Sequence, residues 1–162
     1  HFPAINWLSS YSLYPPSLDQ WFRDNIEQDY PEIRTAISGL LQIEAELQEI
    51  VQLVGSDALP VDQQLTLEVA RMIREYFLQQ NGFHEVDAFC SVDLHYKMAK
   101  AILTFQESAK NAMAAGAELQ DVVNVPARTE LMRGRFESTY ADEIDALVNK
   151  MNEEIAAAIV EN

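Results

Sequence analysis

The stretch from Ile50 to Phe83 constrains the fold most, because it joins two amphipathic segments through a short turn. Gly55 follows the first segment, as glycine commonly does just past the end of a helix, and Pro60 is well placed to begin the next helix. Two long helices joined by so short a turn lie roughly antiparallel. The stretch therefore predicts a long helical hairpin.

Both helices of this hairpin show an apolar repeat at spacings of three, four and seven residues. In the first helix the repeat consists of Ile33, Ile37, Leu40, Leu41, Leu47, Val51 and Val54. In the second it consists of Leu65, Val69, Met72, Ile73, Tyr76 and Phe77, and we expect Glu68, Arg71 and Glu75 to face solvent. Asn81-Gly82 is a turn signal that follows the second helix.

Start and stop signals divide the rest of the chain into further helices. Ser17 and Gln20 have the spacing of a capping box, and the short helix after them would bury Leu18, Trp21, Phe22 and Ile26. Asp29, with Pro31 and Glu32 behind it, marks the start of the first hairpin helix. The remaining helices are expected from Ser91 to Gly116, within Glu118–Val125, from Pro126 to about Gly134, and from Tyr140 to Ile159.

The predicted fold class is therefore all-α, a bundle of about six helices with a long central antiparallel hairpin. Residues 17–162 would form the bundle, and residues 1–16, rich in aromatic residues and Ser and closed by Pro15-Pro16, would be a connector from a preceding domain. The chain opens without an initiator Met, and we expect it to be the C-terminal part of a longer protein.

The composition excludes several classes of partner. The chain of 162 residues has a net charge of −15, which would be repelled by nucleic acid and by anionic lipid. No apolar run approaches the ~20 residues of a membrane span, so we expect no direct membrane insertion. The single cysteine, Cys90, cannot form an internal disulfide and fits a reducing compartment.

The sequence contains no complete active site, so we predict no catalytic residue and no metal site. A GxxxxGK[ST] phosphate loop is absent. His84, Glu85 and His95 do not have the spacing of metal ligands and are more simply surface residues. The acidic residues near the turn are either a solvated helix end or a contact surface. They are Glu44, Glu46, Glu49, Asp57 and Asp62.

Aromatic residues on loops allow a second interpretation. Phe2, Phe83 and Phe89 would by default be core residues, since large aromatics are usually buried. A purine ring, however, needs flat apolar partners on its faces, and such residues could supply them.

Several segments resemble the catalytic A subunit of V-type and archaeal-type rotary ATPases. They are HFPAINWLSSYSLY at His1–Tyr14, LQIEAELQEIVQLVG at Leu41–Gly55, DALP at Asp57–Pro60 and REYFLQQNGF at Arg74–Phe83. The similarity is close from His1 to about Phe105. The resemblance implies the C-terminal helical domain of that subunit, with the nucleotide-binding domain and its Mg²⁺ ligand upstream.

The resemblance also implies roles for particular residues. Phe2 and Pro3 match the loop whose aromatic residue stacks on adenine, and Gln80, Asn81, Gly82 and Phe83 match the opposite wall of that pocket. Gly82 replaces the more usual Ala, and Phe89 is a weaker candidate for the same wall. The turn formed by Gly55, Ser56, Asp57, Ala58, Leu59 and Pro60 matches the part that presses on the central stalk.

The implied function is coupling of ATP hydrolysis or synthesis to rotation of the stalk and to transport of H⁺ or Na⁺. The full-length protein would bind ATP or ADP and assemble with B subunits and central-stalk subunits on the cytoplasmic face of a membrane. This chain alone should be inactive and hold no tightly bound cofactor. The alternative is an acidic helical adaptor that stands alone and binds a basic protein.

Overall fold

The computed structural model describes residues 16–25, 27–78, 92–134 and 140–160, and every regular element in them is helical. The elements are α2 (Pro16–Asn25), α3 (Tyr30–Val54), the 3₁₀ turn η1 (Ser56–Ala58), α4 (Val61–Met72), the π-helix η2 (Ile73–Leu78), α6 (Val92–Ala114), α7 (Leu119–Val123), α8 (Pro126–Gly134) and α9 (Tyr140–Val160). No strand occurs in the described ranges. The predicted all-α class is confirmed.

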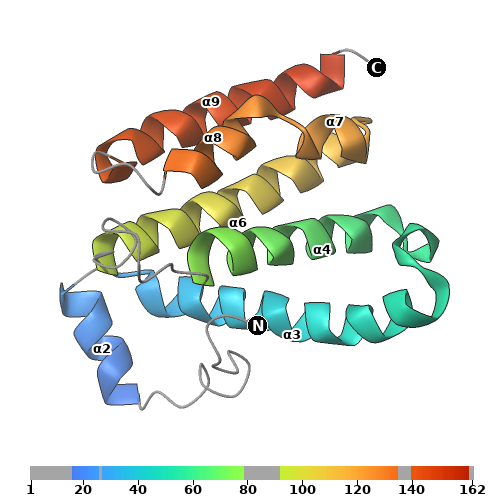
Figure 1. Ribbon diagram of the computed structural model, residues 1–162. Coiled ribbons are helices and arrows are strands. Elements are labelled where there is room, and N and C mark those ends of the chain that lie inside the picture. The colour runs from blue at the N-terminus through green and yellow to red at the C-terminus, as the bar shows by residue number, and fades with distance from the viewer. Residues whose placement is uncertain (1–15, 26, 79–91, 135–139, 161–162) are drawn as a thin grey trace.

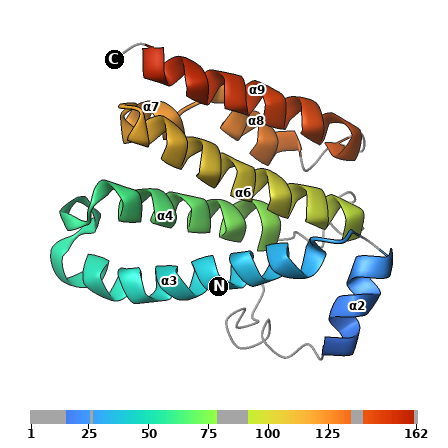
Figure 2. The same cartoon turned by 180° about the vertical axis from the view of Figure 1, so that it is seen from behind.

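The long helices lie in a stack (Figure 1). α3 and α4 run in opposite directions on one side of it, α8 and α9 form the other side, and α6 lies between them in both views (Figures 1 and 2). α6 packs against α3 and α4 as well as against α9. The central position that we expected for the α3–α4 pair is not confirmed, because α6 occupies the middle of the stack.

One hydrophobic core runs through the stack. Its largest fully buried side chains are Ile37, Leu41, Leu65, Val69, Met72, Ile73, Ile102, Phe105, Ile144, Met151 and Ile155. Most of these residues come from the apolar repeats of the sequence. Burying each such side chain contributes about 1.5–3 kcal/mol relative to leaving it exposed, so the core fixes how the helices are placed.

Glycines end two of the long helices, as predicted. Gly55 has φ of +87°, and its N–H donates to the carbonyl oxygen of Val51 at 2.9 Å. Gly116 has φ of +108° just beyond α6. A backbone with positive φ is open to glycine without the steric cost that a Cβ adds, so both helices end where the sequence placed the stop.

Three expectations about individual side chains were wrong. Trp21 of α2 is 54% exposed, not buried. Val54 is exposed although it continues the apolar repeat of α3, because α3 extends past the end of the core. Asp29 is at the N-cap position of α3, but its side chain makes no capping hydrogen bond, because it binds residues of α6 instead.

Candidate functional site

The turn between α3 and α4 is held in shape by backbone and side-chain hydrogen bonds. After Gly55, the N–H of Leu59 donates to the carbonyl oxygen of Ser56 at 3.1 Å, and Nε2 of Gln64 donates to the carbonyl oxygen of Leu59 at 2.9 Å. The side chain of Leu59 is buried and anchors the turn. The other five residues from Gly55 to Pro60 are exposed, so the turn presents a fixed shape to solvent.

Large apolar side chains surround this turn without being covered. Leu53 is 85% exposed and Val54 is 62% exposed, and Ile50 and Val61 are also exposed. We call these four residues the tip surface. Scattered exposed apolar residues are ordinary, but four of them within twelve positions around one turn form a candidate contact surface.

The acidic residues near the turn do not behave as one group. Glu46, Glu49, Asp57 and Asp62 are exposed, as a solvated helix end requires. Glu44 is buried, which contradicts that interpretation for this residue. Its Oε2 accepts a hydrogen bond from Nε of Arg74 at 2.7 Å and forms an ion pair with Nη2 of Arg74 at 2.6 Å. A carboxylate removed from water needs such a partner, so Glu44 joins α3 to the end of α4.

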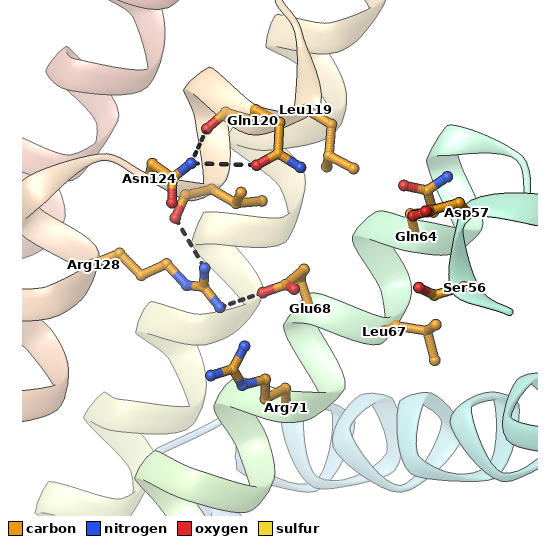
Figure 3. A pocket seen from close by; sticks show the side chains of 11 residues that line it. Ser56, Asp57, Gln64, Leu67, Glu68, Arg71, Leu119, Gln120, Asn124 and Arg128 are labelled. Carbon is orange, nitrogen blue, oxygen red and sulfur yellow. Dashed lines mark hydrogen bonds and ion pairs between the residues drawn. The ribbon is translucent and has the colours of Figure 1, made fainter. Parts of the chain in front are cut away.

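A polar groove of about 260 Å³ lies between the turn and α7 (Figure 3). Glu68 of α4 and Arg128 of α8 meet at its wall, where Nη2 of Arg128 donates to Oε2 of Glu68 at 2.8 Å. Nη1 of Arg128 donates to the carbonyl oxygen of Val123 at 2.9 Å, and the guanidinium carbon lies 5.6 Å from the ring centre of Phe105. Glu68, expected to face solvent, therefore ties α4 to α8. The contacts in the wall of the groove therefore join α4, α7 and α8.

At the opposite end of α3, a second polar cluster joins α3 to α6. The hydroxyl of Tyr96 donates to Oδ1 of Asp29 at 2.6 Å, and Nζ of Lys100 lies 3.5 Å from Oδ2 of Asp29. The hydrogen bond from Tyr96, together with the nearby charge of Lys100, holds the pKa of Asp29 below its usual value. The pKa of Tyr96 is raised, mainly because the hydroxyl is partly buried and also because it donates to Asp29. The Tyr30 and Tyr96 rings stack with centres 6.1 Å apart.

Arg23 of α2 forms a further ion pair at this end of α3. Its guanidinium pairs with the carboxylate of Glu32 in the first turn of α3. The hydrogen bond from Arg23 holds the pKa of Glu32 below its usual value. α2 is thereby linked to α3, although Trp21 on the same helix is exposed.

The residues predicted to contact adenine, Phe2, Pro3, Gln80, Asn81, Gly82 and Phe83, lie outside the described residues, as do Phe89, His84, Glu85 and Cys90. Their roles stay predictions. Among the described residues, no group of three or more His, Cys, Asp or Glu side chains could hold a metal ion. No helix in the same part of the chain is long and apolar enough to cross a membrane.

Comparison with known proteins identifies the family. The family described as the C-terminal domain of V and A type ATP synthase matches residues 19–123, which include the turn and α3 to α7. The chain belongs to this family.

Individual relatives of this V- and A-type ATP synthase domain are similar to the chain over almost its whole length. The similarity therefore continues past Phe105, where the sequence analysis expected it to become weak. The A subunit of the A-type ATP synthase of Methanosarcina barkeri is 48% identical over 157 residues, 97% of this chain and 27% of that protein. Its counterparts in Natronomonas pharaonis and Haloquadratum walsbyi are 47% and 48% identical over 96% and 99% of the chain. The chain spans about a quarter of the length of these relatives.

Sequence reasoning missed the tip surface, although the signal is present. Ile50, Leu53 and Val54 follow one another at spacings of three and one. Ile50 and Leu53 lie outside the apolar repeat that predicted the core. A second group of apolar residues toward the end of a helix indicates a second partner for that helix, and in the structure all three residues are exposed.

Proposed function

We propose that this chain is the C-terminal domain of the catalytic A subunit of a rotary ATPase, and that its tip surface contacts the central stalk. Membership of the V- and A-type ATP synthase family and the exposed apolar side chains around the α3–α4 turn support the proposal. The second observation carries it, because an uncovered apolar surface at the end of a packed helix pair fits contact with another protein.

The domain works as a lever between nucleotide and stalk. α3 and α4 are joined by packing in the core and by the Glu44–Arg74 pair, and α4 is joined to α8 by Glu68 and Arg128. Movement of the domain at the nucleotide end therefore displaces the tip, since packed interiors move as units. Only exposed turn residues and the tip surface reach the stalk. The buried Leu59 keeps the turn rigid and makes no contact of its own.

Adenine is contacted from two sides in this proposal. Phe2 and Pro3 form one wall, and Gln80, Asn81, Gly82 and Phe83 form the other. Nucleotide binding favours the closed arrangement only by its greater affinity for that arrangement. Closure around ATP moves the tip, and hydrolysis and release reverse the movement.

The phosphate chemistry belongs to the rest of the full-length protein. This chain has no phosphate loop motif, so we assign binding of the ATP phosphates and Mg²⁺ to a nucleotide-binding domain in the remaining length of the protein. The chain alone is inactive. In the assembled complex the partners are B subunits and central-stalk subunits, the location is the cytoplasmic face of the membrane, and rotation drives or is driven by movement of H⁺ or Na⁺.

Replacing Leu53 and Val54 together with Asp in the full-length protein tests the stalk contact. Both side chains are exposed, so the domain keeps its fold, but two charges replace the apolar contact. ATP hydrolysis should continue while ATP-driven ion transport by the reconstituted complex falls severalfold. Ile43→Asp, on the same helix and also exposed, is the matched control. Normal transport by the double variant would contradict the proposal.

Phe83→Ala tests the adenine contact separately. Loss of a stacking ring should weaken ATP binding by the complete complex about tenfold, since aromatic stacking on a base contributes on the order of 1–3 kcal/mol. Fluorescence titration with a nucleotide analogue measures the affinity. An unchanged dissociation constant would remove Phe83 from the site.

A further inference from the structure

The polar groove between the α3–α4 turn and α7 adjoins the tip surface. Ser56 and Asp57 belong to the exposed turn and also line the groove. In Figure 3, Asp57 and Gln64 lie on the turn side of the groove, and Asn124, at the end of α7, lies on the opposite side. A partner that contacts the tip surface therefore reaches the mouth of the groove.

The size of the groove fits one long side chain. Its volume of about 260 Å³ is below the roughly 300–1,000 Å³ of pockets that hold drug-sized ligands. Most of the residues that line it are polar or charged. The groove therefore suits a single polar side chain of a neighbouring protein better than a free small molecule.

Hydrogen bonds within the chain determine how two amides of the groove are oriented. Nε2 of Gln64 donates to the carbonyl oxygen of Leu59 at 2.9 Å, and Nδ2 of Asn124 donates to the carbonyl oxygen of Gln120 at 2.7 Å. A backbone carbonyl oxygen only accepts hydrogen bonds, so the nitrogen of each amide must face it. Oε1 of Gln64 and Oδ1 of Asn124 are then the atoms that can bind a group in the groove, and both are acceptors.

The two arginines of the groove already have partners. Arg128 binds Glu68 and the carbonyl oxygen of Val123, and its Nε is buried. Nε of Arg71 donates to Oε1 of Glu75 at 3.1 Å. The bond from Arg128 uses Oε2 of Glu68, so Oε1 of Glu68 can accept a further hydrogen bond. The groove therefore offers acceptor oxygens on both of its sides.

Carboxylates surround the mouth of the groove. Asp57 lines the groove and is exposed. Between positions 35 and 70 the sequence contains no Lys or Arg, and Asp62 of α4 and Asp121 of α7 are also exposed. Clefts with one sign of charge concentrate groups of the opposite sign. Carboxylates and acceptor oxygens together favour a cation that only donates hydrogen bonds, which is the ammonium of Lys or the guanidinium of Arg.

We propose that the groove receives a Lys or Arg side chain of the central-stalk segment that lies on the tip surface. The inference rests on the proposed function and names the chemistry of the partner. Apolar side chains of the stalk cover the tip surface, and a basic side chain beside them lies between Asp57 and the oxygens of Gln64 and Asn124. Apolar contact has no direction of its own, whereas complementary charge fixes the register of two surfaces.

Asp57→Lys in the full-length protein within the complete rotary complex tests the groove. Asp57 is exposed, so the domain keeps its fold, but the new ammonium repels a cation at the mouth of the groove. The ratio of ATP-driven ion transport to ATP hydrolysis by the reconstituted complex should fall severalfold. An unchanged ratio overturns the inference.

Asp62→Lys is the matched control. It makes the same change of charge at an exposed residue of α4 that does not line the groove. The ratio of transport to hydrolysis should stay close to that of the wild type. An equal fall in both variants would mean that the total charge of this end of the molecule acts, not the groove, and would contradict the inference.

Gln64→Lys provides a second variant inside the groove. Its ammonium can donate to the carbonyl oxygen of Leu59 as the amide does, so the turn keeps this bond. The acceptor Oε1 is lost and a cation is added. The ratio should fall as for Asp57→Lys, with a thermal unfolding midpoint near that of the wild type. A wild-type ratio would remove Gln64, and with it the groove, from the contact.

The double replacement of Leu53 and Val54 with Asp, measured alongside, separates this inference from the function on which it rests. A lower ratio for the double variant beside a wild-type ratio for Asp57→Lys overturns only the role of the groove. A wild-type ratio for the double variant contradicts the stalk contact itself.

Discussion

The two ends of α3 are completed in opposite ways. At its beginning, Asp29 and Glu32 are tied to α6 and α2 through Tyr96, Lys100 and Arg23. At its other end, Leu53 is 85% exposed and Val54 is 62% exposed. A helix that is anchored by polar bonds at one end and left apolar and exposed at the other fits the proposed lever, in which the exposed end contacts a second protein.

The exposed end of α3 continues from a part of the same helix that is well packed. Ile37, Leu41 and Leu47 are buried, and α3 continues for about two turns beyond Leu47 before Gly55 ends it. The turn after it is ordered by hydrogen bonds and by the buried Leu59. The chain therefore builds a rigid projection whose outer surface stays uncovered.

The largest expected effect compares the same substitution at two positions on α3. Leu41→Ala removes a side chain that is 2% exposed and should lower the free energy of unfolding by about 2–5 kcal/mol. Leu53→Ala removes one that is 85% exposed and should change it by less than about 0.5 kcal/mol. Chemical denaturation measures both. Equal losses would mean that the tip is packed after all.

The next effect concerns the buried pair. Arg74→Ala leaves the Glu44 carboxylate without its partner and should cost about 1–2 kcal/mol, less than for a fully buried pair because Arg74 is partly exposed. Arg71→Ala, on the same helix and mostly exposed, should cost less than about 0.5 kcal/mol. If thermal and chemical unfolding do not separate the two variants, Glu44 is not held by Arg74 in solution.

A smaller effect of opposite sign distinguishes two glycines of the same region. Gly55→Ala places a Cβ at φ of +87° and should cost about 1 kcal/mol. Gly39 lies inside α3 with open space where its Cβ would be, so Gly39→Ala should stabilise the protein by about 0.5–1 kcal/mol. Unfolding midpoints that move in the same direction would contradict the geometry of the turn.

The smallest effect tests the anchored end through pH. The pKa of Asp29 is lower in the folded protein than its usual value, so its charged form contributes stability that is fully present above the usual pKa. This contribution is lost as the pH falls through the lowered pKa. Asp29→Asn should therefore be less stable than the wild type at neutral pH and should match it more closely in acid. A constant difference across the acid range would show that Asp29 acts by shape alone.

Much of the fold follows from local signals. Gly55 and Gly116 end helices where predicted. α8 spans Pro126–Gly134, beginning at a proline and ending at a glycine as the sequence indicated. These signals act within one turn of the chain, so the sequence displays them directly. The burial of Leu65 and Val69 likewise follows from periodicity.

What could not be predicted depends on contacts between distant residues. The partner of Glu44 is 30 positions away and that of Asp29 is 67 positions away, so neither the burial of the first nor the missing cap of the second can be read locally. Trp21 was expected inside because it lies among the apolar residues of a short helix, and Val54 because it continues the apolar repeat of α3, but both are exposed. The α3–α4 pair was expected at the centre of the bundle, but α6 lies there and packs against α3, α4 and α9.

Cross-linking from the tip tests the stalk contact most directly. In a full-length protein whose cysteines, Cys90 included, are replaced by Ser, Leu53→Cys is introduced into the complete rotary complex, with Ile43→Cys as the control on the same helix. A short thiol-reactive cross-linker should join Leu53→Cys to the central stalk and stop ATP-driven rotation until the link is cleaved. Cross-links from Ile43→Cys alone, or rotation that continues after Leu53→Cys has been linked, would contradict the account.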